Sequence, residues 1–280
     1  MVSSVAMPEL PEVETVCRGL AAHLINASIT QIVVRRRDLR VPVTRKLESA
    51  LKNKKLASIT RRAKYILFHF TDGQVLIIHL GMSGRLLLHK SLPVKYLKHD
   101  HVILEWANGY TLVFNDPRRF GLVTLSSESD LPTHVFFRDL GPEPLDSTWN
   151  GKVLYRALQT SSAPIKSVIM DQRKLVGVGN IYACEALFAA HIHPRRSARC
   201  ITCKEAELLS RSIQNVLQDA IASGGSTLRD YVRSSGEAGY FQHHFRVYGR
   251  QKLPCGVCKK PIVMVRQAGR STFFCRHCQQ

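Results

Sequence analysis

The chain is organised around the stretch Met7-Pro8-Glu9-Leu10-Pro11-Glu12-Val13-Glu14-Thr15. The apolar residues between Leu10 and Leu24 recur at the spacing of one helix face. Pro11 suits the first turn of a helix, where a missing N–H costs nothing, and the neighbouring glutamates suit the positive end of the helix dipole. The stretch therefore predicts a helix that begins here, and a purely structural helix start is the simplest interpretation of it.

Pro8 gives the same stretch a chemical interpretation. If the polypeptide begins at Met7 and this methionine is removed, Pro8 carries a free secondary amine. Such an amine can attack a sugar C1′ carbon and form an iminium, and the carboxylate of Glu9 can transfer the protons. In a chain that retains residues 1–6, the Pro8 nitrogen is a tertiary amide without a nucleophilic lone pair. We therefore expect the catalytically active protein to lack residues 1–6.

The charge of the chain indicates a polyanionic partner. Its 280 residues include 40 Lys and Arg against 21 Asp and Glu, which gives a net charge of +19. This balance favours a nucleic acid, with an acidic membrane surface or the ribosome as alternatives. No apolar run approaches the roughly 18 residues that a membrane span needs. The composition predicts a globular protein of about two domains.

The first half of the chain is predicted to be rich in strands. Short apolar and β-branched runs recur, and Asp72-Gly73 and Asn108-Gly109 fall between them as hairpin turns. About seven antiparallel strands with tight turns imply a sandwich or barrel, with one helix packed alongside. The predicted strands cover residues 28–34, 59–70, 75–80, 85–89, 101–106, 110–114 and 122–125.

The second half is predicted to be helical. Residues 140–145 have the Gly and Pro content of a linker, and beyond them the apolar period lengthens to that of helices. The last helix has a capping box of Thr202 and Glu205 and should stop at Gly224-Gly225. The predicted helices cover residues 152–159, 164–170, 181–190 and 205–223. The predicted domains are residues 7–135, 136–245 and 246–280.

The C-terminal cysteines form the most specific motif in the chain. Cys255-x₂-Cys258-x₁₆-Cys275-x₂-Cys278 has the spacing of a four-thiolate zinc site. Four thiolates leave no position for water, so the zinc is expected to be structural, and a hairpin of this length has too little core to fold without it. Such cysteine usage also indicates a reducing compartment. A much weaker second candidate site comprises His191, His193, Cys200 and Cys203.

The stretch Met7–Thr15 resembles the start of bacterial formamidopyrimidine-DNA glycosylases, and the resemblance continues to the C-terminus. These enzymes excise oxidised purines such as 8-oxoguanine and cut the abasic site that results. The sister endonuclease VIII branch usually has Gly where this chain has Leu10. The resemblance implies an α+β protein: an antiparallel β-sandwich with a flanking helix, a helix-two-turn-helix domain and a zinc hairpin. It also implies Pro8 as the nucleophile, Glu9 as the proton-transfer group, and Lys64 and Arg270 as supporting groups in the β- and δ-elimination steps.

The same resemblance implies a set of DNA contacts. Met82, Arg118 and Phe120 match the side chains that fill the space left by a flipped nucleotide. The structural alternatives are core packing for Met82 and Phe120, a solvated strand edge for Lys64 and a helix N-cap for Asn180. The further contacts that the resemblance implies are His79, His99, Lys166, Asn180 and Tyr248. Residues 234–241 match a loop that closes over the extruded base.

The chain departs from the family at one point that concerns DNA binding. Ser161 and Ser162 stand where basic residues are often found just upstream in the family, so one DNA contact that the resemblance implies is not expected here. The resemblance implies a monomer that acts on double-stranded DNA with oxidised purines or abasic sites, in the cytoplasm of a bacterium at the nucleoid. Two other functions stay open: an endonuclease VIII-like enzyme for oxidised pyrimidines, and a zinc-ribbon nucleic-acid binder without catalysis.

Overall fold

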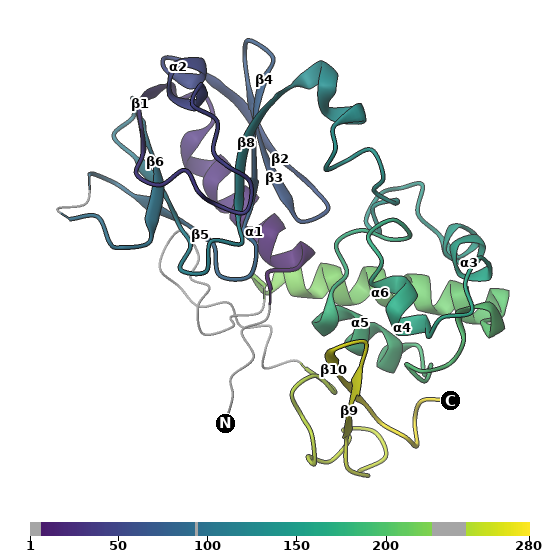
Figure 1. The fold of residues 1–280 in the computed structure, drawn as a ribbon. Coiled ribbons are helices and arrows are strands. Elements are labelled where there is room, and N and C mark those ends of the chain that lie inside the picture. Colours follow the sequence, from purple (N-terminus) through teal and green to yellow (C-terminus); the bar gives the residue numbers. More distant parts are fainter. Residues whose placement is uncertain (1–6, 93–94, 226–244) are drawn as a thin grey trace. The chain divides into compact units, whose positions relative to one another are not determined.

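The structure is a computed structural model that describes residues 7–92, 95–225 and 245–280 (Figure 1). Its contacts divide the chain into two compact units. The first unit runs to Arg138 and includes Gly224 and Gly225, and the second holds residues 139–223 and the C-terminal residues. Residues 1–6 and the predicted base-covering loop at 234–241 lie outside the described residues.

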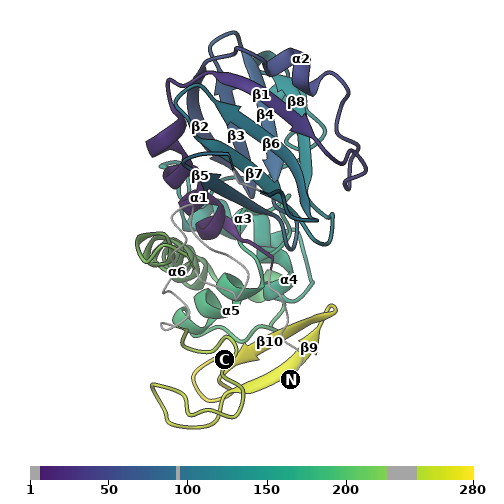
Figure 2. The ribbon, with the colours of Figure 1, turned by 90° about the vertical axis from the view of Figure 1, so that its left-hand side faces the viewer.

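The first unit contains two four-stranded antiparallel sheets, whose strands can be followed in Figure 2. One sheet has the order β1-β6-β7-β5 and the other has the order β2-β3-β4-β8. Alternate residues of both sheets enter a single apolar core, so the predicted antiparallel sandwich is confirmed. The strands are β1 (Ile29–Val34), β2 (Leu56–Arg62), β3 (Tyr65–Phe70), β4 (Gln74–His79), β5 (Arg85–His89), β6 (Asp100–Trp106), β7 (Thr111–Asn115) and β8 (Leu122–Ser127).

Helix α1 (Leu10–Leu24) packs against β2 (Figure 1, purple). Its N-cap is Glu9, which forms a capping box with Glu12, and a proline lies in its first turn. Both features stabilise a helix start by satisfying or removing unpaired N–H groups. The predicted apolar face is buried, so the helix prediction is confirmed; the face comprises Leu10, Val13, Cys17, Leu20 and Leu24.

One predicted strand is wrong. Residues 59–70 do not form a single strand, because Arg62 pairs with Tyr65 across a two-residue turn between β2 and β3. Ala63 in this turn has a φ of +52°. Lys64 therefore lies in the turn and is buried, so the alternative that places it on a solvated strand edge is wrong. The apolar pattern continues on both sides of the turn, since both strands face the same core, and it gave no signal of a break.

The second unit is built on helix α6 (Cys203–Ala222), which packs against α3 and α5. The predicted capping box of Thr202 and Glu205 is present. Gly224, just beyond the end of the helix, has a φ of +77° and fits the left-handed position that terminates helices. The other helices of this unit are α3 (Gly151–Gln159), α4 (Ile165–Ile169), α5 (Asn180–Ala189) and the 3₁₀ turn η2 (Ala198–Cys200).

The C-terminal hairpin consists of β9 (Val263–Gln267) and β10 (Arg270–Phe274) (Figure 1, yellow). Ala268 and Gly269 make the turn, with φ of +47° and +75°. Two left-handed residues are typical of the hairpin turns that match strand twist. Arg270 directly follows this turn as the first residue of β10. None of the helices in the described part of the chain is long and apolar enough to span a bilayer. Three short helical elements were not predicted, namely α2 (Leu47–Leu51) and the 3₁₀ helices η1 (Glu128–Thr133) and η2 (Ala198–Cys200).

Candidate functional site

Pro8 and Glu9 lie at the N-terminal end of α1, and both are buried. The Glu12 carboxylate accepts the N–H of Glu9 at 3.0 Å, and the Glu9 side chain accepts the backbone N–H of Glu12. This reciprocal pair fixes the Glu9 side chain at the residue that follows Pro8. The geometry therefore holds a buried carboxylate adjacent in the chain to the predicted nucleophile.

Lys64 and His79 lie at one end of the β2-β3-β4 sheet. Lys64 is 7% exposed in the β2–β3 turn, and Tyr65 beside it pairs with His79 across the ladder. Burial lowers the pKa of His79 to about 4, and the positive charges of Lys64 and Arg40 contribute to the same shift. The His79 Nδ1 accepts the N–H of Gly81 at 2.9 Å. His79 is therefore a neutral ring that anchors the loop of Met82.

Because His79 is buried as a neutral ring, acidification should lower the free energy of unfolding. The folded protein binds a proton at His79 with a pKa of about 4, against 6.5 for an unperturbed histidine, so the unfolded chain is protonated first as the pH falls. The contribution of His79 to the free energy of unfolding should be fully present above pH 6.5 and should fall by about 3 kcal/mol between pH 6.5 and 4. A His79→Gln variant, which does not titrate, should lose this part of the pH dependence in urea unfolding at pH 7 and 4.5. An identical pH slope in both proteins would refute the assignment.

Asp116 joins the Met82 loop to the loop that carries Arg118 and Phe120. Its fully buried carboxylate accepts the Ser83 hydroxyl at 2.6 Å and the N–H of Gly121 at 2.7 Å. The Ser83 hydroxyl oxygen accepts the N–H of Arg118 at 3.1 Å. The two bonds of Ser83 cross between the loops, and the bond from Gly121 closes the loop of Arg118 and Phe120. The Asp116 carboxylate therefore sets the position of the two loops relative to each other.

The two loops present an aromatic ring and a cation together. Phe120 is 45% exposed, so the alternative that buries it in the core is wrong. The guanidinium of Arg118 lies 4.9 Å from the centre of its ring. Gly81 has a φ of +63°, and a Cβ there would lie 2.5 Å from the Phe120 carbonyl carbon. Only glycine allows this approach, which brings partly exposed Met82 to the same end of the sandwich.

His99 lies beside the same loop. Its carbonyl accepts the N–H of Asp116 at 3.0 Å, and its ring lies 6.2 Å from that of His101. The structure therefore gathers His79, Met82, His99, Arg118 and Phe120 around two joined loops of the first unit. These are five of the eight residues that the resemblance implies as DNA contacts.

A second group of predicted residues meets in the second unit. The Lys166 ammonium donates to the Asn180 Oδ1 at 2.5 Å and to the Thr272 hydroxyl at 2.7 Å. The Asn180 amide donates to the Ser271 carbonyl at 2.9 Å. The network ties α4, the start of α5 and β10 together. Gly179, rather than Asn180, is the N-cap of α5, so the N-cap alternative for Asn180 is wrong.

Arg270 opens onto the same region. It lines a small cavity of about 190 Å³ together with Lys166, Met170, Asp171 and Gln267. Arg270 itself is exposed, whereas Lys166 is 2% exposed. Two cations that line one cavity, here beside the Asp171 carboxylate, suit an anionic group such as a phosphate.

Tyr248 is held by a residue that sequence reasoning missed. Glu185 on α5 is 2% exposed, and its carboxylate accepts the backbone N–H groups of Arg246, Val247 and Tyr248 at 2.7–3.0 Å. Desolvation raises its pKa, although the three N–H groups favour the charged form. A single acid in the apolar stretch of α5 was the available signal. Asp116 gave no comparable signal, because its partners are brought to it only by the folded loops.

The four C-terminal cysteines converge as predicted. Their Sγ atoms all lie within 4.8 Å of one another, with Cys255 and Cys278 at 3.9 Å and Cys258 and Cys275 at 3.4 Å. A tetrahedral ion with Zn–S bonds of about 2.3 Å needs sulfur atoms about 3.8 Å apart. The donor set therefore fits zinc. In residues 7–92, 95–225 and 245–280 no other such cluster of His, Cys, Asp or Glu is found, so the second candidate site is not assembled.

Comparison with known proteins identifies this architecture. Three family models match consecutive parts of the chain: the formamidopyrimidine-DNA glycosylase N-terminal domain at residues 7–123, the H2TH domain of that glycosylase at 140–232, and the zinc finger found in FPG and IleRS at 252–280. Together they define a glycosylase architecture of sandwich, two-turn helical motif and zinc finger. The zinc-finger match and the cysteine cluster together identify a site for one structural Zn²⁺.

Relatives match over their full length. The formamidopyrimidine-DNA glycosylase of Wolbachia pipientis wMel is 47% identical over 275 residues, covering 98% of this chain and 100% of the relative. The MutM (Fpg) crystal structure from Thermus thermophilus superposes with a TM-score of 0.87 at 37% identity, covering 97% of this chain and 98% of that one. The Lactococcus lactis Fpg (MutM) complex with N7-benzyl-Fapy-dG DNA gives 0.90 at 34% identity, covering 98% and 100%. The chain belongs to the formamidopyrimidine-DNA glycosylase family.

Proposed function

We propose that this protein is a DNA glycosylase of base excision repair that removes oxidised purines and then cleaves the abasic site. The observation that carries the proposal is the joined pair of loops that presents Met82, Arg118 and Phe120 within a full-length family match. A partly exposed aromatic ring with a cation against it suits insertion into the gap that a flipped nucleotide leaves. The hydrogen bonds of Asp116 hold the two loops together, which suits side chains that must keep their positions while they insert between bases.

The proposed chemistry begins at Pro8. Its amine nitrogen bonds to C1′ of the flipped nucleotide as the C1′–base bond breaks, and the base leaves with the bonding electrons and a proton. Glu9 supplies and removes protons during base loss and ring opening, and the product is an iminium. The iminium withdraws electrons, so that β- and then δ-elimination break the two flanking C–O bonds. Lys64 and Arg270 support these eliminations by proton transfer and by binding phosphate.

This chemistry requires a free amine at Pro8. The match to the family's N-terminal domain starts at Met7, which supports a mature chain that begins with Pro8. The proposed substrate is double-stranded DNA bound by one protein molecule at the bacterial nucleoid. The remaining DNA contacts are proposed for His79, His99, Lys166, Asn180 and Tyr248.

A wider range of substrates is the second candidate function. One solved structure of the L. lactis relative, at 34% identity and a TM-score of 0.89, contains DNA with an oxidised pyrimidine. We therefore include oxidised pyrimidines as a secondary substrate class.

The decisive experiment uses duplexes with one 8-oxoguanine opposite cytosine, incubated with protein that begins at Pro8. We expect base loss, strand products of β- and δ-elimination, and a covalent protein–DNA adduct when borohydride is present. Protein that keeps residues 1–6 should form no adduct. A matched duplex with 5-hydroxycytosine measures the pyrimidine activity. Binding without any base loss would leave only a zinc-ribbon DNA binder and would refute the proposal.

A further inference from the structure

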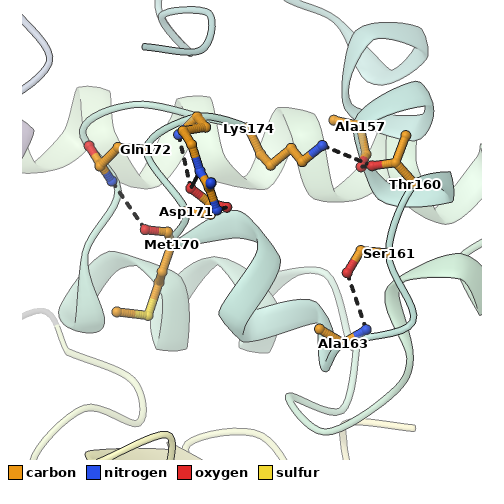
Figure 3. Close-up of polar contacts among 9 residues, drawn as sticks. Ala157, Thr160, Ser161, Ala163, Met170, Asp171, Gln172 and Lys174 are labelled. Carbon is orange, nitrogen blue, oxygen red and sulfur yellow. Dashed lines mark hydrogen bonds and ion pairs between the residues drawn. The ribbon is translucent and has the colours of Figure 1, made fainter. Parts of the chain in front are cut away.

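The loop between α3 and α4 carries Ser161 and Ser162 and has a lysine beside it from a later part of the sequence. Figure 3 shows Lys174 reaching across to this loop, where its ammonium donates to the Thr160 hydroxyl at 3.0 Å. The Thr160 hydroxyl donates in turn to the carbonyl of Ala157 at 2.8 Å. Lys174 is thus placed at the start of the loop by a helix-end hydroxyl.

The backbone of Lys174 is also fixed. Its N–H donates to the Asp171 carbonyl at 2.8 Å, and the Gln172 carbonyl accepts the N–H of Gly141 at the same distance. A Cβ on Gly141 would lie 2.8 Å from the carbonyl carbon of Lys174. The close packing at Gly141 holds the turn of residues 171–174 in place and so restricts where Lys174 can reach.

Lys174 differs from its neighbour Arg173 in its partners. The Arg173 guanidinium forms two bonds to the Asp171 carboxylate, at 3.1 and 2.9 Å, so its charge is largely compensated. Among the described residues, Lys174 has a hydroxyl partner and no carboxylate within ion-pair distance. The ammonium keeps donors for an anion, because a lysine has three and a hydroxyl takes one.

The two serines add donors at the same place. The Ser161 oxygen accepts the N–H of Ala163 at 3.2 Å (Figure 3), and its own proton meets no acceptor in the described parts of the chain. The Ser162 side chain and its backbone N–H likewise make no hydrogen bond there, and Ser162 is exposed. A cation beside two hydroxyls and a backbone N–H is a donor set that suits phosphate oxygens.

The loop is continuous with the second group of predicted DNA contacts. Asp171, which starts the turn of Lys174, lines the same small cavity as Lys166 and Arg270. Ser161 lies four residues before the first residue of α4, Ile165, and Lys166 is the second residue of that helix. A DNA strand that contacts Arg270 can therefore continue along the same unit to Lys174.

We propose that Lys174, with Ser161 and Ser162, binds one phosphate of the DNA backbone, and that it supplies the charge that related enzymes often place within the loop itself. The inference rests on the proposed function, because it assumes that DNA is the ligand. The site positions the duplex and carries no sequence information, since it contacts the backbone alone.

The test is the salt dependence of binding to a duplex with a tetrahydrofuran abasic site, measured by fluorescence anisotropy over a series of KCl concentrations. Losing one phosphate contact lowers the slope of log K against log[salt] by about 0.9. We expect this decrease and a several-fold weaker affinity near physiological salt for Lys174→Ala and Lys174→Gln. Arg173→Ala is the matched control and should leave the slope unchanged. Adding Ser161→Lys to Lys174→Ala should restore the slope.

The outcomes separate the inference from the proposed function. An unchanged slope in both Lys174 variants, or an equal decrease in Arg173→Ala, overturns the phosphate site. Failure of the Ser161→Lys change to restore the slope in a folded double variant also overturns it. Wild-type protein that shows no salt-dependent duplex binding contradicts the proposed function instead.

Discussion

Replacing Pro8 by Gly, in protein that begins at residue 8, should slow excision of 8-oxoguanine by about 10³-fold or more, because loss of a catalytic nucleophile costs several orders of magnitude. Glycine keeps an N-terminal amine, but this amine is primary. Without the pyrrolidine ring, the backbone at residue 8 can also rotate away from the conformation in which the amine attacks C1′. Duplex binding should change by only a few-fold, since the proposed phosphate contacts lie elsewhere. Single-turnover excision and anisotropy measure the two quantities separately.

Pro11 provides the matched control for this experiment. Pro11 lies in the first turn of α1, and Pro8 lies just before this helix. Unlike Pro8, Pro11 has no proposed role in the chemistry. Pro11→Ala should lower stability slightly and leave the excision rate within about tenfold of wild type. Wild-type excision by the Pro8→Gly protein would remove the nucleophile from the proposed mechanism.

Removing zinc, or replacing Cys258 by Ser, should weaken duplex binding by at least about 100-fold. Structural zinc contributes on the order of 10 kcal/mol to the folding of such small modules, and β9 and β10 have little core of their own. The hairpin supplies the Ser271 carbonyl and the Thr272 hydroxyl as acceptors for Lys166 and Asn180. Unfolding of the hairpin therefore also breaks these hydrogen bonds. Metal content by atomic absorption and anisotropy on the same sample test this.

Cys200→Ser is the control for the zinc experiment. Cys200 is exposed and lies outside the four-cysteine cluster, so this variant should keep one zinc per chain and normal binding. A metal-free protein that binds the duplex as tightly as wild type would show that the hairpin folds, or is dispensable, without the ion.

Features that depend on neighbours in the sequence were predictable. The start of α1, the capping box of α6, the turns at Asp72-Gly73 and Asn108-Gly109 and the two Cys-x₂-Cys pairs each rest on residues a few positions apart. Their energetics are local, so the sequence pattern carries them.

Features that depend on the assembled fold were not predictable in the same way. The β2–β3 turn was missed because both strands are apolar up to its edge. Glu185 acts through backbone N–H groups, which every sequence offers equally, and the Ser83 partner of Asp116 lies 33 residues away in the chain, so no local residue pattern marks either set of partners. The resemblance to the family pointed to the candidate residues. The structure shows which carboxylates hold them: Asp116 holds the loops of Met82, Arg118 and Phe120, and Glu185 holds the backbone of Tyr248.

The shared carboxylate of Asp116 has a mechanical consequence for how the protein would inspect DNA. Because one group ties both loops, in the proposed function a push of the Phe120 ring against a base pair would also advance Met82. An intact pair would then resist both side chains together, so each inspection of a base pair would be a single trial that succeeds or fails as a whole.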